Sequence, residues 1–271
     1  MRLLPALAFA LGLHLFAGAA AAAAAAAAPA SPDGGRELIL ESLRRNAQPP
    51  FVFEEQTLVM SDRLGQHTVR TMRYYARCDD GGCQRLLRVQ TPAESRGMSV
   101  FVARGAGGGT RRGAEAASPI FGSDYSVADF EGEQPQDFLY EREAGEDLNR
   151  VPHFVLRARP KDDAVARATG YGDRRLYLRK DRLSLSRIDH LDRKGRVVRR
   201  QTFRDQRPDE NGAWRAAMVL IEDLAGQRST LLKIDRRVLS PDYVPAEVFA
   251  GAKAALALRP AGADAAKTGQ P

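Results

Sequence analysis

The sequence predicts a mainly β protein, built on one large curved antiparallel sheet with a few covering helices. From Phe51 onward, segments of strand length follow one another and are bounded by Gly, Pro or Asp. Short turns join about nine or ten of these segments in succession, which favours a single antiparallel sheet. A sheet of that size has to curl or close on itself.

The first residues are expected to direct the chain out of the cytoplasm. Arg2 supplies a basic start, the stretch 3–16 is mostly apolar, and an alanine-rich run ends at Pro29. This order is typical of a cleaved signal peptide, which we place at residues 1–28. A membrane anchor would need roughly 20 strongly apolar residues, and alanine contributes little to insertion. We expect one folded domain over residues 31–256 and a disordered tail over residues 257–271.

The net charge of the chain restricts its partners. It is +7, and one unit less once Arg2 is removed, because the expected signal peptide contains no acid. A basic balance is compatible with nucleic acid or with an anionic surface. Export separates the protein from nucleic acid, so we expect no nucleic-acid partner. Anionic phospholipid head groups remain compatible with this charge.

A helix is expected before the strands begin. In residues 35–47, Leu38, Ile39 and Leu43 fall on one helical face and the arginines on the other, with Ser31 or Asp33 as the cap. The segments that follow have strand length and alternate with turns. In order they are FVFEEQTLVMSD, a turn at residues 63–65, QHTVRTMRYYAR, QRLLRVQTP and GMSVFVAR.

The second half of the chain continues this meander. HFVLRARP places Phe154, Leu156 and Ala158 on one strand face. RRLYLRK and SLSRIDHLDRKGRVVRRQTFRD follow, with a turn at residues 192–195, and then WRAAMVLIED and RSTLLKIDRRVL form a hairpin across residues 224–227. The run 216–221 is apolar at consecutive positions, so we expect that strand to be covered on both faces. VPAEVFAGAKAALAL is expected to be helical, with apolar positions at Val248, Phe249, Ala252 and Leu256.

Two cysteines, Cys78 and Cys83, flank a turn sequence, CDDGGC. The exported compartment is oxidising, and Asp-Gly is a hairpin-turn pair, so we expect a structural disulfide that closes a turn. A redox-active pair normally has the tighter C-x-x-C spacing.

Motifs for metal or nucleophilic chemistry are lacking. The histidines that follow the signal, His67, His153 and His190, form no H-E-x-x-H pattern, and His190 with Asp192 is a weak metal pattern. The pair at residues 122–123, Gly-Ser, lacks the G-x-S-x-G frame of a nucleophile elbow. We therefore expect no metal site, no cofactor and no enzyme.

Two pairs of acids leave one alternative open. Glu54 with Glu55, or Asp124 with Asp129, could serve as paired carboxylates for glycoside chemistry. Spacing alone does not separate such a pair from surface acids. An envelope hydrolase that uses Asp124 and Asp129 is therefore our weakest hypothesis.

The stretch SPIFGSDYSVADFEGE, residues 118–133, carries the resemblance to a known family. FGSDYS at 121–126, followed by Asp129 and Phe130, resembles the F-x-G-S-D-F-S-Y-E-D signature of the outer-membrane lipoprotein-sorting protein family, the LolA-like periplasmic carriers. Val127 and Ala128 depart from the signature's second aromatic residue and its glutamate. The order of the neighbouring strands and the VPAEVF ending also fit, so the resemblance spans residues 51–249.

The resemblance implies a half-open barrel, LolA-like, whose open side is covered by helices and whose apolar hollow shelters acyl chains. Gly122 would then permit a tight turn, Ser123 or Asp124 would cap a short helix that starts near Ser126, and the acids that follow Phe130 would face water. Aromatic side chains of the signature would cover the mouth, or would simply be part of the core. The candidates for the cavity or its cover are Phe121, Tyr125, Phe130, Phe154, Leu156, Trp214, Met218 and Leu220.

Two functional hypotheses follow. The first is a periplasmic carrier that binds acyl chains of outer-membrane lipoproteins or other lipids, and that meets an inner-membrane transporter or an outer-membrane receptor. On this hypothesis, Met218→Lys or Leu220→Lys would abolish cargo binding. The second is an adaptor or sensor that uses the same fold to bind a membrane export pump of the resistance-nodulation-division type.

Overall fold

The computed structural model describes residues 34–107 and 109–257, together with the side chains of these residues up to 254. The expected signal peptide at 1–28 and the tail from residue 258 lie outside the described residues, and so do Ser31 and Asp33. All described residues belong to one compact unit, Pro32–Pro271. Within the described ranges, no helix is long and apolar enough to cross a membrane.

The described part of the chain forms a 12-stranded antiparallel sheet in the order β5-β4-β3-β2-β1-β14-β13-β10-β9-β8-β7-β6. Its edges, β5 and β6, are not paired with each other, so the sheet is curved but open. The expected fold class is confirmed. The strands are β1 Phe51–Ser61, β2 His67–Asp79, β3 Gly82–Thr91, β4 Ser99–Gly105, β5 Thr110–Arg112, β6 Phe138–Leu148, β7 Val151–Pro160, β8 Arg174–Arg179, β9 Leu185–Leu191, β10 Val197–Arg204, β13 Met218–Asp223 and β14 Arg228–Val238, with β11 Arg207–Pro208 and β12 Trp214–Arg215 in a separate hairpin.

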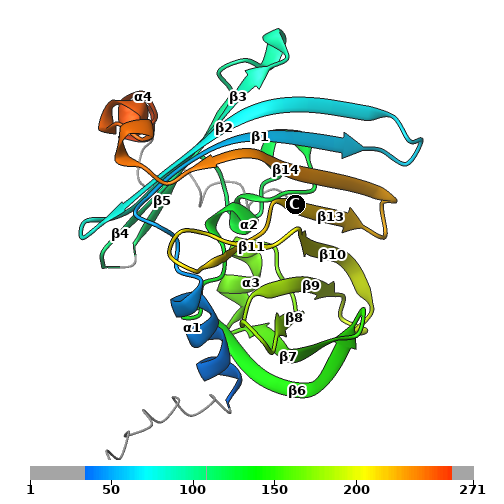
Figure 1. The fold of residues 1–271 in the computed structure, drawn as a ribbon. Coiled ribbons are helices and arrows are strands. Elements are labelled where there is room, and N and C mark those ends of the chain that lie inside the picture. The colour runs from blue at the N-terminus through cyan, green and yellow to red at the C-terminus, as the bar shows by residue number, and fades with distance from the viewer. Residues whose placement is uncertain (1–33, 108, 258–271) are drawn as a thin grey trace, which may run out of the picture. The chain divides into compact units, whose positions relative to one another are not determined.

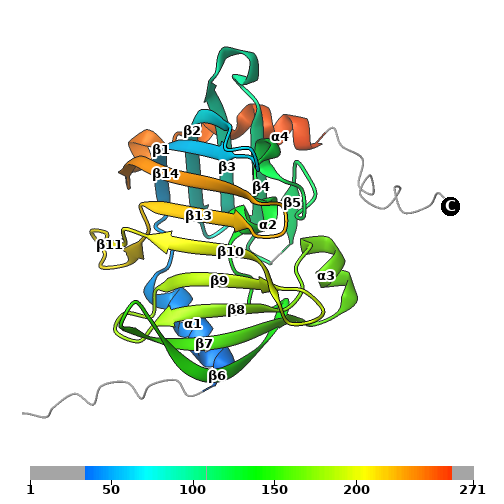
Figure 2. The ribbon, with the colours of Figure 1, turned by 90° about the vertical axis from the view of Figure 1, so that its right-hand side faces the viewer.

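Short helices line both sides of this sheet. Figure 1 shows the sheet curling around α2 and α3, with α4 on the other side of the strands β1 to β5. Figure 2 shows α1 behind the strands β6 to β9. The helices are α1 Gly35–Arg45, α2 Val127–Glu131, α3 Asp163–Thr169 and α4 Ala250–Ala257, with single 3-10 turns η1 Ala93–Ser95, η2 Ile120–Gly122, η3 Pro241–Tyr243 and η4 Ala246–Phe249.

Helix α1 packs through only part of its expected apolar face. Leu38 and Ile39 are buried, whereas Leu43 is exposed, so the apolar face is narrower than the sequence pattern predicts. The residue at the N-cap is Gly34, and no side chain bonds to this end of the helix. Arg44 and Arg45 both pair with Glu41 on the solvent side. Packing of two apolar residues, rather than a side-chain cap, therefore fixes this helix.

The structure confirms the expected disulfide but not the expected burial of residues 216–221. Cys78 and Cys83 pair directly across β2 and β3 and are disulfide-bonded, with 4.0 Å between their Cα atoms. The expectation that residues 216–221 are covered on both faces was wrong. Ile221 is fully buried, but the five residues before it are only half-buried. The reason is that β13 lies at the middle of the sheet, where the described helices cover only one face.

Alternation along the strands gives the sheet an inner face, which we define as the face that contacts α1 and α2. Cross-strand partners from Leu156 through Leu176, Ile188 and Gln201 to Ile221 lie on this one face. It carries two separate apolar clusters. The α2 cluster comprises Leu58, Met72, Leu87, Val89, Val100, Val102, Ile120, Val127, Phe130 and Leu232, and the α1 cluster comprises Leu38, Ile39, Phe138, Leu156, Ala158, Leu176, Leu178, Leu183 and Ile188.

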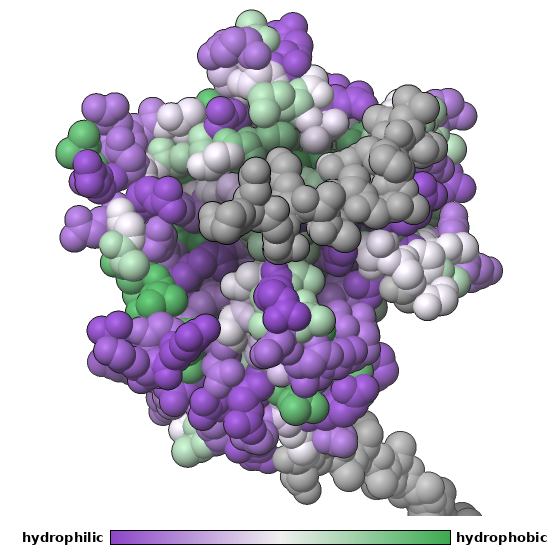
Figure 3. Space-filling model, turned by 180° about the vertical axis from the view of Figure 1, so that it is seen from behind, coloured by the Kyte–Doolittle hydropathy of each residue, from purple (hydrophilic) through white to green (hydrophobic). Residues whose placement is uncertain are grey.

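The outer face has an apolar cluster of its own. Phe53, Leu86 and Phe101 pack there against Val244 and Phe249, next to α4. Both helices at the ends of the described chain thus cover strands, as the sequence predicts. Seen from behind, the described surface is mostly hydrophilic, with apolar residues in small scattered patches (Figure 3).

Candidate functional site

The signature segment, residues 118–133, lies against the inner face and turns sharply at its start. Phe121 and Gly122 have φ angles of 52° and 79°, which is the left-handed region that glycine enters at least cost. Arg70 of β2 donates through Nη1 to the Phe121 carbonyl oxygen at 3.0 Å. Asp124 is bonded to β14, because its backbone N–H donates to Thr230 Oγ1 at 2.9 Å. The segment is thus attached to strands on both sides of β1.

Helix α2 is capped by Ser126 and not, as expected, by Ser123 or Asp124. Ser126 Oγ accepts from the Asp129 backbone N–H at 3.1 Å, and Asp129 Oδ2 accepts from the Ser126 backbone N–H at 2.8 Å, a reciprocal capping box. Ser123 Oγ instead donates to the Ile120 carbonyl oxygen at 2.6 Å and closes the preceding turn. The cap lies further along the chain because the turn at Gly122 uses the Ser123 hydroxyl.

Asp129 is the centre of a buried polar cluster. Its side chain is 3% exposed and forms an ion pair with Arg199 of β10. The Tyr171 hydroxyl and Gln201 Nε2 also donate to this carboxylate. Burial by itself raises the pKa of Asp129, but the Arg199 charge and these hydrogen bonds outweigh it and lower the pKa below its usual value. Asp129 is therefore an anion whose oxygens are fully used by the protein.

His190 completes this cluster as a neutral side chain. Arg199 Nη1 lies 2.8 Å from His190 Nε2, and because a guanidinium only donates, Nε2 must be the acceptor. Burial, and then the charge of Arg199, lower the pKa of His190 well below its usual value. No group of three or more His, Cys, Asp or Glu in the described ranges could hold a metal ion.

The expectation that the acids that follow Phe130 face water was wrong. Like Asp129, Glu131 is buried and pairs with Arg112. Glu133 is 7% exposed in its side chain and pairs with Arg174, whose Nη1 and Nη2 donate at 2.9 and 2.8 Å. Each carboxylate can stay buried because an arginine of the sheet forms an ion pair with it. The attraction between the two charges offsets the cost of removing both from water.

A cavity of about 230 Å³ lies between the signature segment and the sheet, beside the α2 cluster. Tyr125 and Phe130 of the signature segment line one side, and Val219, Leu232 and Ile234 of the sheet line the other. Glu54 lies at its wall, where Arg237 Nε donates to it at 2.6 Å. The cavity wall is thus apolar where α2 faces the sheet, and polar beside Glu54 and Arg237.

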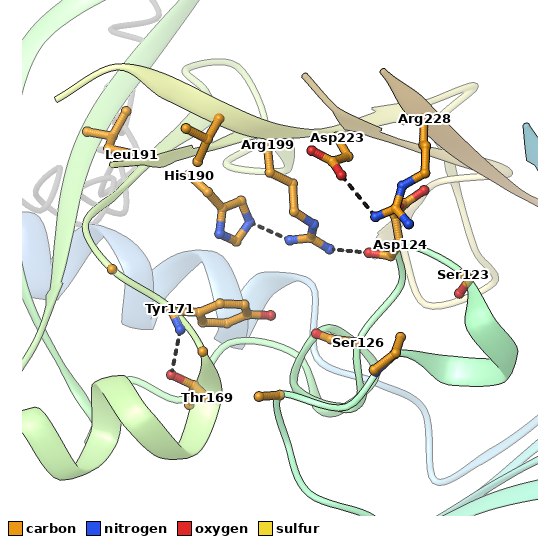
Figure 4. A pocket seen from close by; sticks show the side chains of 15 residues that line it. Ser123, Asp124, Ser126, Thr169, Tyr171, His190, Leu191, Arg199, Asp223 and Arg228 are labelled. Carbon is orange, nitrogen blue, oxygen red and sulfur yellow. Dashed lines mark hydrogen bonds and ion pairs between the residues drawn. The ribbon is translucent and has the colours of Figure 1, made fainter. Parts of the chain in front are cut away.

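A second cavity, of about 380 Å³, is lined by Arg199 and by both polar and apolar side chains. Figure 4 shows Arg199 between His190 and Asp124, with Tyr171 below them. Arg228 at its rim pairs with both Asp124 and Asp223. Arg199 likewise pairs with Asp129, so the charged side chains around this cavity form ion pairs.

A family model described only as an uncharacterized protein matches residues 83–253, which is more than half of the chain. The chain belongs to this family. No curated protein matches the sequence.

The fold of this family member is similar to that of several solved structures. A domain from Vibrio parahaemolyticus that is named for outer membrane lipoprotein sorting has a TM-score of 0.68 at 18% identity, and the match covers 82% of this chain and 98% of that one. A DUF1329 family protein from Desulfovibrio piger has a TM-score of 0.66 at 19% identity, covering 79% and 97%. A LolA superfamily protein from Nitrosomonas europaea has a TM-score of 0.59 at 14% identity, covering 80% and 98%.

This LolA-like fold does not bring all of the candidate cavity residues together. Phe121, Tyr125 and Phe130 belong to or pack against the α2 cluster. Phe154 and Leu156 are on the same inner face but in the α1 cluster, across the polar cluster. The two sets therefore face separate apolar regions.

The other three candidates lie away from the inner cavity. Trp214 is in the β11–β12 hairpin, where Arg182 stacks on its ring at 3.8 Å. Met218 and Leu220 point to the outer face, because Val219 between them pairs with Leu232 of the α2 cluster. On β13, the inner-face positions are thus Val219, Ile221 and Asp223.

Sequence reasoning missed the side chains that hold the signature segment in this family member. Arg199 and Gln201 lie two residues apart on β10 and so share a face, and both bond to Asp129. Their spacing in VVRRQTF was a usable signal for a polar stripe. Nothing in the sequence, however, indicated that the stripe is buried.

Proposed function

We propose that this protein is a periplasmic carrier that binds an acyl chain of a lipid or of an outer-membrane lipoprotein in the cavity beneath α2. The observation that carries the proposal is the cavity of about 230 Å³ between Phe130 of the signature segment and Val219 and Ile234 of the sheet. The name of the Vibrio parahaemolyticus domain supports the same cargo class.

The α2 segment has the properties of a cover over this cavity. Its apolar side chains, such as Val127 and Phe130, are buried against the sheet. Polar contacts through Asp124 and Asp129 connect the segment to the strands. Each methylene that leaves water contributes about 0.8 kcal/mol. An acyl chain longer than the cavity would take the place of Phe130 or Tyr125, and the cargo would then cover the apolar surface of the sheet that these side chains had covered.

The test uses two adjacent residues of β13 that point to opposite faces. Val219→Lys places a charge in the cavity, whereas Leu220→Lys places the same charge on the outer face. The measurement is the equilibrium binding of a fluorescent fatty acid to each purified chain, together with native mass spectrometry of chains purified without detergent. Circular dichroism establishes that both variants are folded.

We expect Val219→Lys to reduce probe affinity by tenfold or more, because an unpaired charge among the apolar side chains of the cavity is costly, and Leu220→Lys to leave it within about twofold, because residue 220 does not line the cavity. Equal loss in both variants, or no probe uptake by the unaltered chain, would contradict the carrier. A co-purifying mass of lipid or acylated protein would identify the cargo.

A further inference from the structure

Three hairpin turns project from the same end of the sheet. They connect β1 to β2, β9 to β10 and β13 to β14, and Figures 1 and 2 place them at one end. The strand register agrees, because Ser61 pairs with Ser229 and Asp223 pairs with Arg199 close to the turns. Strands lie about 4.8 Å apart, so neighbouring turns are separated by about 10 Å.

The three turns have the same sequence frame, Asp-x-x-Gly, at residues 62–65, 192–195 and 223–226. Asp62 Oδ1 accepts from the backbone N–H of Leu64 at 2.8 Å and of Gln66 at 2.9 Å. Asp192 Oδ1 accepts in the same way from Lys194 at 2.8 Å and Arg196 at 2.9 Å, and Asp223 Oδ1 accepts from Gly226 at 2.9 Å. The acids are therefore bound to the backbone behind each tip.

The side chains at the tips are basic or apolar. Leu64 is 73% exposed and Leu224 is 45% exposed. Arg63, Arg193 and Lys194 are exposed beside them, and the described residues include no ion-pair partner for these three cations. This end of the sheet thus presents unpaired positive charge together with two exposed leucines.

We propose that the three tips dock on the surface of an anionic phospholipid bilayer. Arg63, Arg193 and Lys194 would lie among phosphate head groups, and Leu64 and Leu224 would enter the boundary of the acyl region. A bilayer fits this surface because the charges are spread over neighbouring tips and need only a diffuse negative layer. Two other hairpin turns with the Asp-x-x-Gly frame, at residues 79–82 and 209–212, lie at the other end of the strands, and their central residues are Asp80 and Gly81, and Glu210 and Asn211.

Docking would also orient two cavities that lie beside the tips. The cavity of about 380 Å³ is lined by Asp223 and Arg228. A further one of about 410 Å³ is lined by Asp62 and Gln66, and shares Arg228 with the first. Both thus lie beside the tips and would face the head-group layer. Docking of the tips does not require cargo in the cavity beneath α2.

The test is co-sedimentation of the purified chain with vesicles of phosphatidylethanolamine and phosphatidylglycerol, and with vesicles of phosphatidylcholine alone. One variant removes the tip cations, Arg63→Gln/Arg193→Gln/Lys194→Gln, and a second removes the tip leucines, Leu64→Ser/Leu224→Ser. The controls remove three cations, and one exposed leucine, elsewhere in the chain. They are Arg111→Gln/Arg204→Gln/Arg207→Gln, at the other end of the strands, and Leu139→Ser, on the edge strand β6.

We expect the unaltered chain to sediment with anionic vesicles and not with phosphatidylcholine. The triple tip variant should bind on the order of 100-fold more weakly, because each cation near such a surface contributes about fivefold. The leucine variant should lose at least about tenfold, and added salt should release the unaltered chain. The controls should keep their affinity, corrected for net charge.

Three results would overturn the proposal. They are equal losses in the tip and control variants, equal binding to both kinds of vesicle, and a tip-dependent complex with a protein instead of lipid. Fatty-acid binding, measured on the same variants, distinguishes a failure of membrane docking from a failure of the proposed carrier function. Tip variants should take up the probe normally, whereas Val219→Lys should still sediment with anionic vesicles.

Discussion

Arg199 of β10 donates to Asp129 of α2 across 70 residues of sequence, and both side chains are largely buried. The same guanidinium also donates through Nη2 to the Asp124 carbonyl oxygen at 2.9 Å and through Nη1 to His190 Nε2 at 2.8 Å. One arginine thereby connects the signature segment to the middle of the sheet.

Asp129→Asn should therefore destabilise the protein strongly. The substitution leaves the charge of Arg199 buried without its partner, which costs about 3 kcal/mol. Urea denaturation measures the free energy of unfolding. Asp147→Asn, an exposed acid on β6, is the matched control and should change it by less than about 0.5 kcal/mol. Similar effects of the two substitutions would show that the buried pair is not important for stability.

Because His190 is buried and neutral, we expect the protein to lose stability in mild acid. Its folded pKa lies well below the usual value of 6.5, so the unfolded chain binds the proton at a higher pH than the folded chain does. The stabilising contribution of neutral His190 is thus complete above pH 6.5 and falls as the pH is lowered toward the folded pKa.

Urea denaturation between pH 7.5 and pH 5 should show this loss at up to about 1.4 kcal/mol per pH unit for one proton. His190→Gln should make the profile flatter over that range. His153 shares the direction, because burial lowers its pKa too, so part of the slope should remain. Substitution of the exposed His67 by Gln is the control, and an equal flattening there would contradict the assignment to His190.

Phe130→Ala distinguishes a core residue from a cover residue. Phe130 is 8% exposed and meets Tyr74 edge-on with 5.7 Å between ring centroids. Truncation should cost about 3 kcal/mol of stability. Because Phe130 lines the inner cavity, the same change should enlarge it and raise affinity for longer fatty acids. Reduced stability with unchanged fatty-acid affinity would mean that Phe130 is a core residue alone.

The disulfide should contribute to stability in a way that reductant reveals. Cys78 and Cys83 close a loop of sequence separation 5, for which loop-closure entropy predicts about 2 kcal/mol. Cys78→Ser/Cys83→Ser should lower the free energy of unfolding by that amount. Dithiothreitol should lower it equally in the unaltered chain and have no effect on the variant. A reductant effect that persists in the variant would rule out this account.

Most of the strands and their hairpin turns could be predicted from local signals, but β5, β6 and β11 were not predicted. Asp-x-x-Gly and Asp-Gly at turns, and Gly or Pro between apolar segments, act within a few residues, which is the range that sequence patterns describe. The face of β13 could not be predicted in this way. Alternation separates Val219 from Leu220, but only the packing of Val219 against the α2 cluster identifies the inner face.

The sequence by itself determined the class of fold, most of the hairpins, the disulfide pair and the sharp turn at Gly122, because each depends on neighbouring residues. The tertiary structure alone decided that Asp129, Glu131 and Glu133 are buried. A carboxylate stays buried only where a cation meets it, and the cations here, Arg199, Arg112 and Arg174, come from different strands of the sheet. The sequence around each acid does not indicate which arginine pairs with it.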